Sequence, residues 1–199
     1  MDHHRLFPSR RHILTAGALA SGLAVIRDRA FAQELPPTPA CHDGDEPTLP
    51  DIEGPFFKPK SPLRSDLRKG AISGRPAELS GTVLTRSCRP VPGVLVDLWQ
   101  ADDKGEYDNK GFRLRGHVFT DDAGRYSFRT IVPGLYPGRT RHFHLKVQAP
   151  ARPVLTTQFY FPGEPLNRFD EFFRRELLMQ VAKTGDELQA RFDVVLALQ

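Results

Sequence analysis

The sequence predicts an all-β protein built as an antiparallel β-sandwich. From residue 79 onward, short runs rich in β-branched and aromatic residues alternate with turns that contain Gly, Pro or Asp. Strands of this length and spacing are typical of sandwiches, whereas βαβ units would place long helical patterns between the strands. The chain has 199 residues, which is enough for one domain with a hydrophobic core.

Six strand-like runs are expected before the C-terminal region: 79–84, 94–99, 118–120, 125–131, 142–147 and 158–161. The segment Arg89-Pro90-Val91-Pro92-Gly93 marks the turn between the first two. Residues 167–181 predict one helix, whose apolar stripe would consist of Phe172, Phe173, Leu177 and Leu178. A last strand is expected over 191–198.

Residues 1–32 have the features of an export signal. Ser9-Arg10-Arg11-His12 is followed by a weakly polar stretch, 13–26, and then by Ala30-Phe31-Ala32. This order is typical of a twin-arginine signal with an A-x-A-like cleavage site. A membrane anchor is the alternative, but a span needs about 20 apolar residues. We therefore expect a folded chain carried by the twin-arginine translocase to the periplasm or beyond, with no stable membrane insertion once the signal is removed.

The charge of the chain changes when this signal is set aside. Residues 1–32 hold five arginines and two aspartates, so the formal net charge falls from +4 to +1 without them. The mature part therefore gives no indication of a nucleic-acid-binding surface.

Residues 33–50 are rich in proline and polar residues and predict an extended arm before a domain over 51–199. The two cysteines are Cys41, in this arm, and Cys88. In an oxidising compartment an even pair favours one disulfide, which would tie the arm to the sandwich and constrain the unfolded chain by about 4 kcal/mol. Two free buried thiols are the alternative.

The candidate functional residues are two tyrosines and two histidines: Tyr107, Tyr136, His142 and His144. Alternate side chains of a strand share one face, so His142 and His144 would point together while Phe143 enters the core. Paired imidazoles indicate a metal site, because histidine is the commonest metal ligand, and phenolate oxygens would favour a hard ion such as ferric iron. A solvated strand with two ordinary histidines is the alternative.

Several segments, in order, carry a likeness to a known family: Glu53-Gly54-Pro55-Phe56-Phe57, 92–102, Gly105-Glu106-Tyr107, 112–116, 122–137, 139–144, 157–161 and 190–196. Over about residues 50–198 the chain resembles the intradiol ring-cleavage dioxygenases, the catechol and protocatechuate 3,4-dioxygenase group. The resemblance implies the sandwich of that family and a reaction that inserts both atoms of O2 into a catecholic ring to give a cis,cis-muconate-type product.

The resemblance also implies roles for individual residues. Non-haem ferric iron, Fe(3+), would be held by Tyr107 and His142 in equatorial positions and by Tyr136 and His144 in axial ones. A displaced Tyr136 phenolate would take up a substrate proton. Arg139 matches an arginine that stabilises charge developing on the substrate, and Gln158 matches a glutamine of the same pocket.

Departures from the family pattern concern the pocket and the assembly. Five residues separate Tyr136 from His142, and Gly138 stands where protocatechuate dioxygenases have a bulky aromatic side chain. Both features predict a more open mouth and a broader or larger substrate. The helical dimerisation region of catechol 1,2-dioxygenases has no counterpart here, so homo-oligomerisation stays open.

Two other readings compete with this one. A metal-free, exported, transthyretin-like binding module would not need two tyrosines and two histidines to converge. A cupin-type metal enzyme would use the His-x-His pair with a carboxylate, and the sequence lacks a glutamate at the spacing of that family.

Overall fold

The computed structural model of the protein describes residues 46–70 and 73–199. Its strands are β1 (Pro76–Leu84), β2 (Leu95–Trp99), β3 (Arg115–Phe119), β4 (Arg125–Ile131), β5 (His142–Gln148), β6 (Leu155–Tyr160), β7 (Gln180–Thr184), β8 (Glu187–Arg191) and β9 (Val194–Val195). Two short 3-10 turns, η1 (Pro165–Arg168) and η2 (Arg175–Leu177), lie between β6 and β7.

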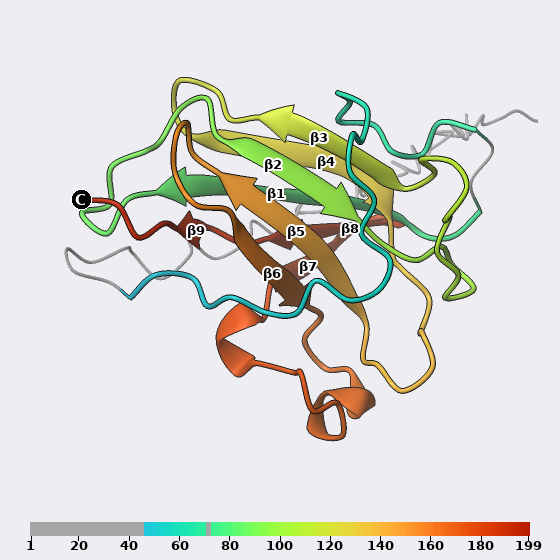
Figure 1. Cartoon of the computed structure of the whole chain (residues 1–199). Coiled ribbons are helices and arrows are strands. Elements are labelled where there is room, and N and C mark those ends of the chain that lie inside the picture. Colours follow the sequence, from blue (N-terminus) through green and yellow to red (C-terminus); the bar gives the residue numbers. More distant parts are fainter. Residues whose placement is uncertain (1–45, 71–72) are drawn as a thin grey trace, which may run out of the picture. The chain divides into compact units, whose positions relative to one another are not determined.

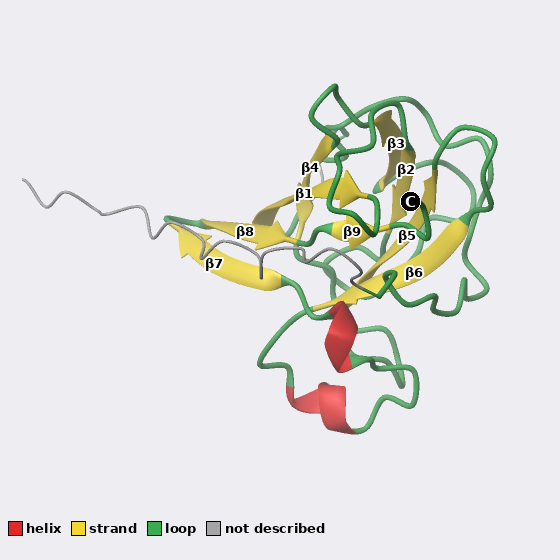
Figure 2. Cartoon of the chain, turned by 90° about the vertical axis from the view of Figure 1, so that its left-hand side faces the viewer, coloured by secondary structure: helices red, strands yellow, loops and turns green. Residues whose placement is uncertain are grey.

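The strands form two sheets that pack face to face (Figures 1 and 2). One sheet has the order β4-β1-β8-β7, with β9 joined to β1, and the other has the order β3-β2-β5-β6. The core between them includes the fully buried Leu79, Phe128, Phe143, Leu145 and Phe159. The predicted β-sandwich is confirmed.

The six predicted strands are confirmed as β1 to β6, with bounds that differ by up to three residues. The first sheet is mixed, since β1 pairs antiparallel with β4 but parallel with β8 and β9. The prediction missed β7 and β8, and the strand expected over 191–198 is reduced to β9.

The helix predicted over 167–181 is wrong. The segment contains only the end of η1, the turn η2 and the start of β7. Backbone N–H groups of the segment form hydrogen bonds outside a helical pattern. The N–H of Phe172 donates to the Asp170 carboxylate at 3.0 Å, and the N–H of Met179 donates to the Tyr160 carbonyl at 3.0 Å. An aspartate that offers the backbone such a local partner competes with helix formation.

In the described part of the chain, none of the helical segments is long and apolar enough to cross a membrane.

Several predictions concern residues outside the described ranges, namely the export signal, most of the arm over 33–50, and Cys41. Residues 46–50 have no regular secondary structure. Cys88 is disulfide-bonded.

The outer face of the β3-β2-β5-β6 sheet is covered by the chain that precedes β1, drawn in cyan in Figure 1. The N–H of Asp51 donates to the Thr156 carbonyl at 2.9 Å, and the N–H of His117 donates to the Pro62 carbonyl at 3.0 Å. The covering segment therefore crosses the sheet from β6 to β3. Side chains of β5 that do not enter the core lie beneath it.

The strand register sets which side chains meet on this covered face. His144 of β5 lies opposite Trp99 of β2 and opposite Gln158 of β6. Since neighbouring strands of a sheet are about 4.8 Å apart, these three side chains form one row across it. His142 lies two residues earlier on the same face of β5.

Candidate metal centre

The four candidate ligands line one cavity of about 270 Å³. His142 and His144 come from β5, Tyr107 from the loop between β2 and β3, and Tyr136 from the loop between β4 and β5. The remaining residues of the cavity wall are Ile52, Gly54, Pro55, Phe56, Arg139 and Phe172. The fold therefore brings together residues that the sequence spreads over three segments.

Three donor atoms lie at the corners of a small triangle. The distance between His142 Nε2 and His144 Nε2 is 3.0 Å, that between His144 Nε2 and Tyr107 Oη is 3.1 Å, and that between Tyr107 Oη and His142 Nε2 is 3.4 Å. Two ligands bound about 2.1 Å from one ion, at roughly a right angle, are about 3.0 Å apart. The triangle therefore has the size expected of adjacent ligands of a metal.

The tautomer of His142 is fixed by its backbone neighbour. The Nδ1 atom lies 2.6 Å from the Thr140 carbonyl oxygen, which can only accept, so Nδ1 carries the proton. Nε2 then presents its lone pair to the triangle, which is the arrangement that orients metal-bound histidines. Burial lowers the pKa of His142 to about 4, and the nearby Arg139 charge acts in the same direction. The imidazole is therefore neutral and able to bind a cation at neutral pH.

His144 is held more deeply. Its ring stacks on Trp99 with centroids 4.9 Å apart, and only 2% of the residue is exposed. Burial holds the pKa of its imidazole well below the usual value. Its Nδ1 atom is buried without a hydrogen-bond partner among the described residues, so packing on Trp99 rather than a hydrogen bond sets the ring orientation.

Tyr107 reaches the triangle because two loops approach closely. A Cβ atom on Gly105 would lie 2.1 Å from the Leu135 carbonyl oxygen, so only glycine lets the Tyr107 loop contact the Tyr136 loop there. The Tyr107 ring stacks on Phe56 with centroids 4.4 Å apart. Burial raises the pKa of the Tyr107 phenol above its usual value, so ionisation requires the field of a cation such as a bound metal.

Tyr136 stands apart from the triangle but in the same cavity. Its ring lies 6.0 Å from the Tyr107 ring and 5.3 Å from the Phe56 ring, in edge-to-face contacts. The neighbouring Gly138 is exposed, and a Cβ atom built there would meet nothing within 4 Å. Gly138 is not among the residues that line the cavity, so the more open mouth stays a prediction.

Arg139 and Gln158 contact each other, but they differ in access to the cavity. The Arg139 Nη2 group donates to Gln158 Oε1 at 2.6 Å, and Gln158 Nε2 donates to the Ile52 carbonyl at 2.8 Å. Arg139 lines the cavity, whereas Gln158 is fully buried behind it. Gln158 therefore fixes the positions of Arg139 and of the covering segment through these two hydrogen bonds.

Sequence reasoning missed three residues of this site. Phe56 and Phe172 form apolar walls of the cavity, and Asp170 pairs with Arg139. In the sequence Phe56 stands only within a segment that resembles a known family, and Asp170 and Phe172 fall within the predicted helix that does not form. The apolar spacing of that segment predicts a helix and gives no sign that Asp170, alone among its acidic residues, is buried.

The donor chemistry fits ferric iron. Over residues 46–70 and 73–199, no group of three or more His, Cys, Asp or Glu side chains is arranged to hold a metal. The site instead combines phenol oxygens with neutral imidazole nitrogens. Two phenolates are hard anionic ligands that would offset the charge of a trivalent ion, and two imidazoles complete a mixed set.

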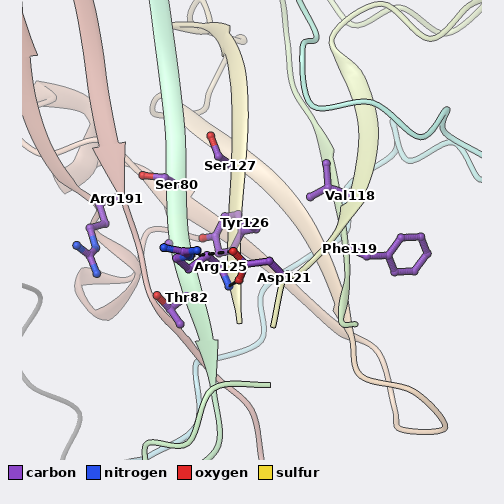
Figure 3. Close-up of a pocket in the computed structure, with 10 residues that line it drawn as sticks. Ser80, Thr82, Val118, Phe119, Asp121, Arg125, Tyr126, Ser127 and Arg191 are labelled. Carbon is purple, nitrogen blue, oxygen red and sulfur yellow. Dashed lines mark hydrogen bonds and ion pairs between the residues drawn. The ribbon is translucent and has the colours of Figure 1, made fainter. Parts of the chain in front are cut away.

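A larger hollow of about 510 Å³ lies elsewhere and is lined by residues of β1, β3, β4 and β8 (Figure 3). Its Arg125 is already paired with Asp121 at 2.9 Å, and its side chains include Ser80, Thr82 and Ser127. It contains none of the four candidate ligands. Size alone therefore does not identify the functional cavity.

The chain is similar to several known proteins. A family model described as Dioxygenase matches residues 52–141. The chain is 33% identical to the protocatechuate 3,4-dioxygenase beta chain of Burkholderia cepacia, over 68% of this chain and 72% of that one. It is 30% identical to a hydroxyquinol 1,2-dioxygenase of Nocardioides simplex, over 73% of this chain and 63% of the relative.

Solved structures show the same fold. The dioxygenase domain of a dioxygenase carbohydrate-binding protein fusion from the cellulolytic bacterium Streptomyces sp. SirexAA-E is 54% identical, with a TM-score of 0.76, over 77% of this chain and all of that one. The 3-chlorocatechol 1,2-dioxygenase of Rhodococcus opacus 1CP is 27% identical, with a TM-score of 0.68, over 75% of this chain and 72% of that one.

The metal-free protein is expected to lose stability as the pH falls from about 6.5 to about 4. The folded-state pKa of His142 is about 4, whereas an unfolded histidine has a pKa of about 6.5, so the unfolded chain binds the proton first in this window. The difference corresponds to roughly 3 kcal/mol. Thermal unfolding in the presence of a chelator, between pH 7 and 4, measures the loss. A His142→Gln variant should show a shallower dependence, and equal slopes for the two proteins would contradict the assignment.

Proposed function

Because the chain belongs to the intradiol ring-cleavage dioxygenase family and is an oxidoreductase of that kind, we propose that it holds one ferric ion and cleaves a catecholic ring with O2. The observation that carries the proposal is the triangle of Tyr107 Oη, His142 Nε2 and His144 Nε2. A metal-free binding module would have no use for three buried polar atoms held at this spacing.

The four candidate ligands would hold the ion, with Tyr136 completing the set from across the cavity. When bound, the ferric ion would supply a Lewis-acidic centre that draws electron density from a catecholate and makes its ring reactive toward O2. Cleavage between the two hydroxyl-bearing carbons gives a cis,cis-muconate-type diacid.

The protein's own groups would handle the proton and the charge. A catechol that binds through both oxygens must lose two protons. Tyr136, whose ring stands apart from the close triangle, would accept one of them if the bound ion holds it as a phenolate. The other proton would leave with water that the substrate displaces from the cavity. Arg139 is the only charged side chain among the described residues that line the cavity. Its guanidinium would stabilise negative charge on the substrate in a partly dry site.

The cavity wall indicates which substituents the ring can carry. Beyond the proposed ligands, the wall is formed by Ile52, Pro55, Phe56 and Phe172, together with Arg139. The Arg139 charge is already balanced by Asp170, whose carboxylate lies 2.9 Å from Arg139 Nε. The side of the guanidinium that Asp170 does not hold would serve the charge on the ring oxygens. A carboxylate substituent against the apolar wall would therefore lose water without a cation of its own, which is unfavourable.

Export by the twin-arginine route is part of the proposal. The order Ser9-Arg10-Arg11, the weakly polar stretch 13–26 and Ala30-Phe31-Ala32 supports it. The disulfide bond of Cys88 agrees with an oxidising compartment, because such bonds are rare in reducing cytosol.

The purified protein is expected to contain iron and to be red-brown, from charge transfer between phenolate and ferric iron. Tyr107→Phe and Tyr136→Phe should each weaken or shift the visible band, because each removes a phenol that lines the cavity. Elemental analysis and visible absorption measure both properties. Tyr126→Phe is the matched control, since that hydroxyl donates to the Phe192 carbonyl at 2.6 Å in the core. A colourless protein that binds no iron would refute the proposed function.

Catechols with uncharged substituents are expected to be better substrates than those with a ring carboxylate. The ratio of kcat/KM between 4-methylcatechol and protocatechuate should be about tenfold or more, which corresponds to about 1.4 kcal/mol. The measurement is ring-cleavage absorbance over a panel that also includes catechol and hydroxyquinol. Equal or better use of protocatechuate would show that a cation reaches the substituent.

The signal is expected to be cleaved after Ala32, the last residue of its A-x-A-like site, so that the exported protein begins at residue 33. Mass analysis of the chain recovered from the periplasm or medium of an expressing bacterium tests this. Replacing both Arg10 and Arg11 by lysine should hold the protein in the cytoplasm, because the translocase reads the arginine pair. Unchanged export of that variant would exclude the twin-arginine route.

A further inference from the structure

Asp170 is the most deeply buried carboxylate near the site, with only 1% of its side chain exposed. It lies in the loop between β6 and β7, after η1. Its two oxygens accept from Arg139 Nε at 2.9 and 3.1 Å, from the N–H of Thr140 at 2.8 Å and from the N–H of Phe172 at 3.0 Å. One carboxylate therefore joins the Arg139 side chain and the Thr140 backbone to its own loop, through the N–H of Phe172.

The first of these elements is the Arg139 guanidinium. Asp170 holds its Nε side and Gln158 holds Nη2, so two corners of a planar group are fixed. The Phe172 ring lies against the same group, 4.9 Å from Arg139 Cζ. Within the described part of the chain, Nη1 has no hydrogen-bond partner and stays available to a substrate in the cavity that Arg139 lines.

The second element is the backbone that orients His142. The peptide N–H of Thr140 donates to Asp170, and the carbonyl of Thr140 accepts the Nδ1 proton of His142. The Thr140 hydroxyl adds a bond of 2.6 Å to Asn167 of η1. The loop that carries Asp170 is thus attached to the residue that fixes a proposed ligand.

We propose that Asp170 is a positioning residue for ring cleavage: it aims the Arg139 guanidinium at the substrate and keeps the β6–β7 loop closed against the cavity. This inference rests on the proposed function. If the carboxylate is lost, Arg139, whose side chain is 12% exposed, remains a nearly buried cation without its partner. Such a cation moves toward water, because burying an unpaired charge is costly.

The test compares two single changes in one loop. Asp170→Asn keeps the size of the side chain but places an amide where Arg139 needs a carboxylate. The expected result is a fall in kcat on the order of 10²-fold, the scale of losing one charge-stabilising group, with a smaller change in KM. Iron content and the visible band should stay at the wild-type level, because the four ligands are unchanged and the asparagine amide oxygen can still accept from the Thr140 N–H beside His142.

The matched control is Glu164→Gln. Glu164 belongs to the same loop and pairs with Arg141 Nε at 2.8 Å, but neither residue lines the cavity. Loosening of the loop by a lost ion pair is thus common to both variants, whereas kcat should fall only for Asp170→Asn. An equal fall in both, or no fall in Asp170→Asn, would overturn the inference.

A double substitution separates positioning from general stability. In an Arg139→Gln background, Asp170→Asn should lower kcat by less than threefold, because residues that act through one another are not additive. A full additional 10²-fold loss would show that Asp170 acts independently of Arg139. Asp170→Glu, which keeps the charge, should restore part of kcat, and it serves as the test if thermal unfolding shows that Asp170→Asn does not fold.

The control on the proposed function is the wild-type protein itself. Wild-type protein without iron or ring cleavage would reject the proposed function. Iron-loaded, active wild-type protein together with a fully active Asp170→Asn variant would reject only the role of Asp170.

Discussion

The close approach of three donor atoms is the constraint on which the rest of the site depends. Two imidazole nitrogens and a phenol oxygen lie 3.0 to 3.4 Å apart in a place from which water is largely excluded. Polar atoms so arranged gain little from one another in the absence of a cation, and burial lowers the pKa of both histidines. The fold must therefore supply the stability that keeps them together.

That stability comes from the sandwich beneath the site and the segment above it. Alternate residues of β5 serve both purposes, since Phe143 and Leu145 are fully buried in the core while His142 and His144 face the covering segment. Placing the ligands on the outer face of a sheet, beneath irregular chain, lets loops vary the cavity without disturbing the core. Most of the wall other than the histidines comes from residues outside the strands, such as Ile52, Phe56 and Phe172.

The sequence predicted the strands that alternate strongly and the residues that meet in the cavity, but not the loop that closes it. β1 and β4 alternate in burial along their length, and β2, β5 and β6 are mostly buried. β7 is partly exposed, and β8 alternates in burial but has only Leu188 and Ala190 as apolar residues, so both resemble polar loops in the sequence. The apolar spacing of 167–181 favours a helix until Asp170 is placed opposite Arg139, a contact across 31 positions that no local pattern contains. The ligand set followed from the resemblance to a family, because single tyrosines carry no sign of their partners.

The same long-range contact explains why this loop can be irregular and still be well fixed. A helix satisfies its own backbone and needs only an apolar face, whereas here the Asp170 carboxylate, the Asn167 amide and the Tyr160 hydroxyl take up backbone groups of the loop and its neighbours. Tyr160 Oη lies 2.9 Å from the Phe172 carbonyl oxygen and 2.8 Å from Asp51 of the covering segment. The loop and the covering segment are therefore tied to the same side chain of β6, so a change that moves one wall of the cavity is expected to move the other.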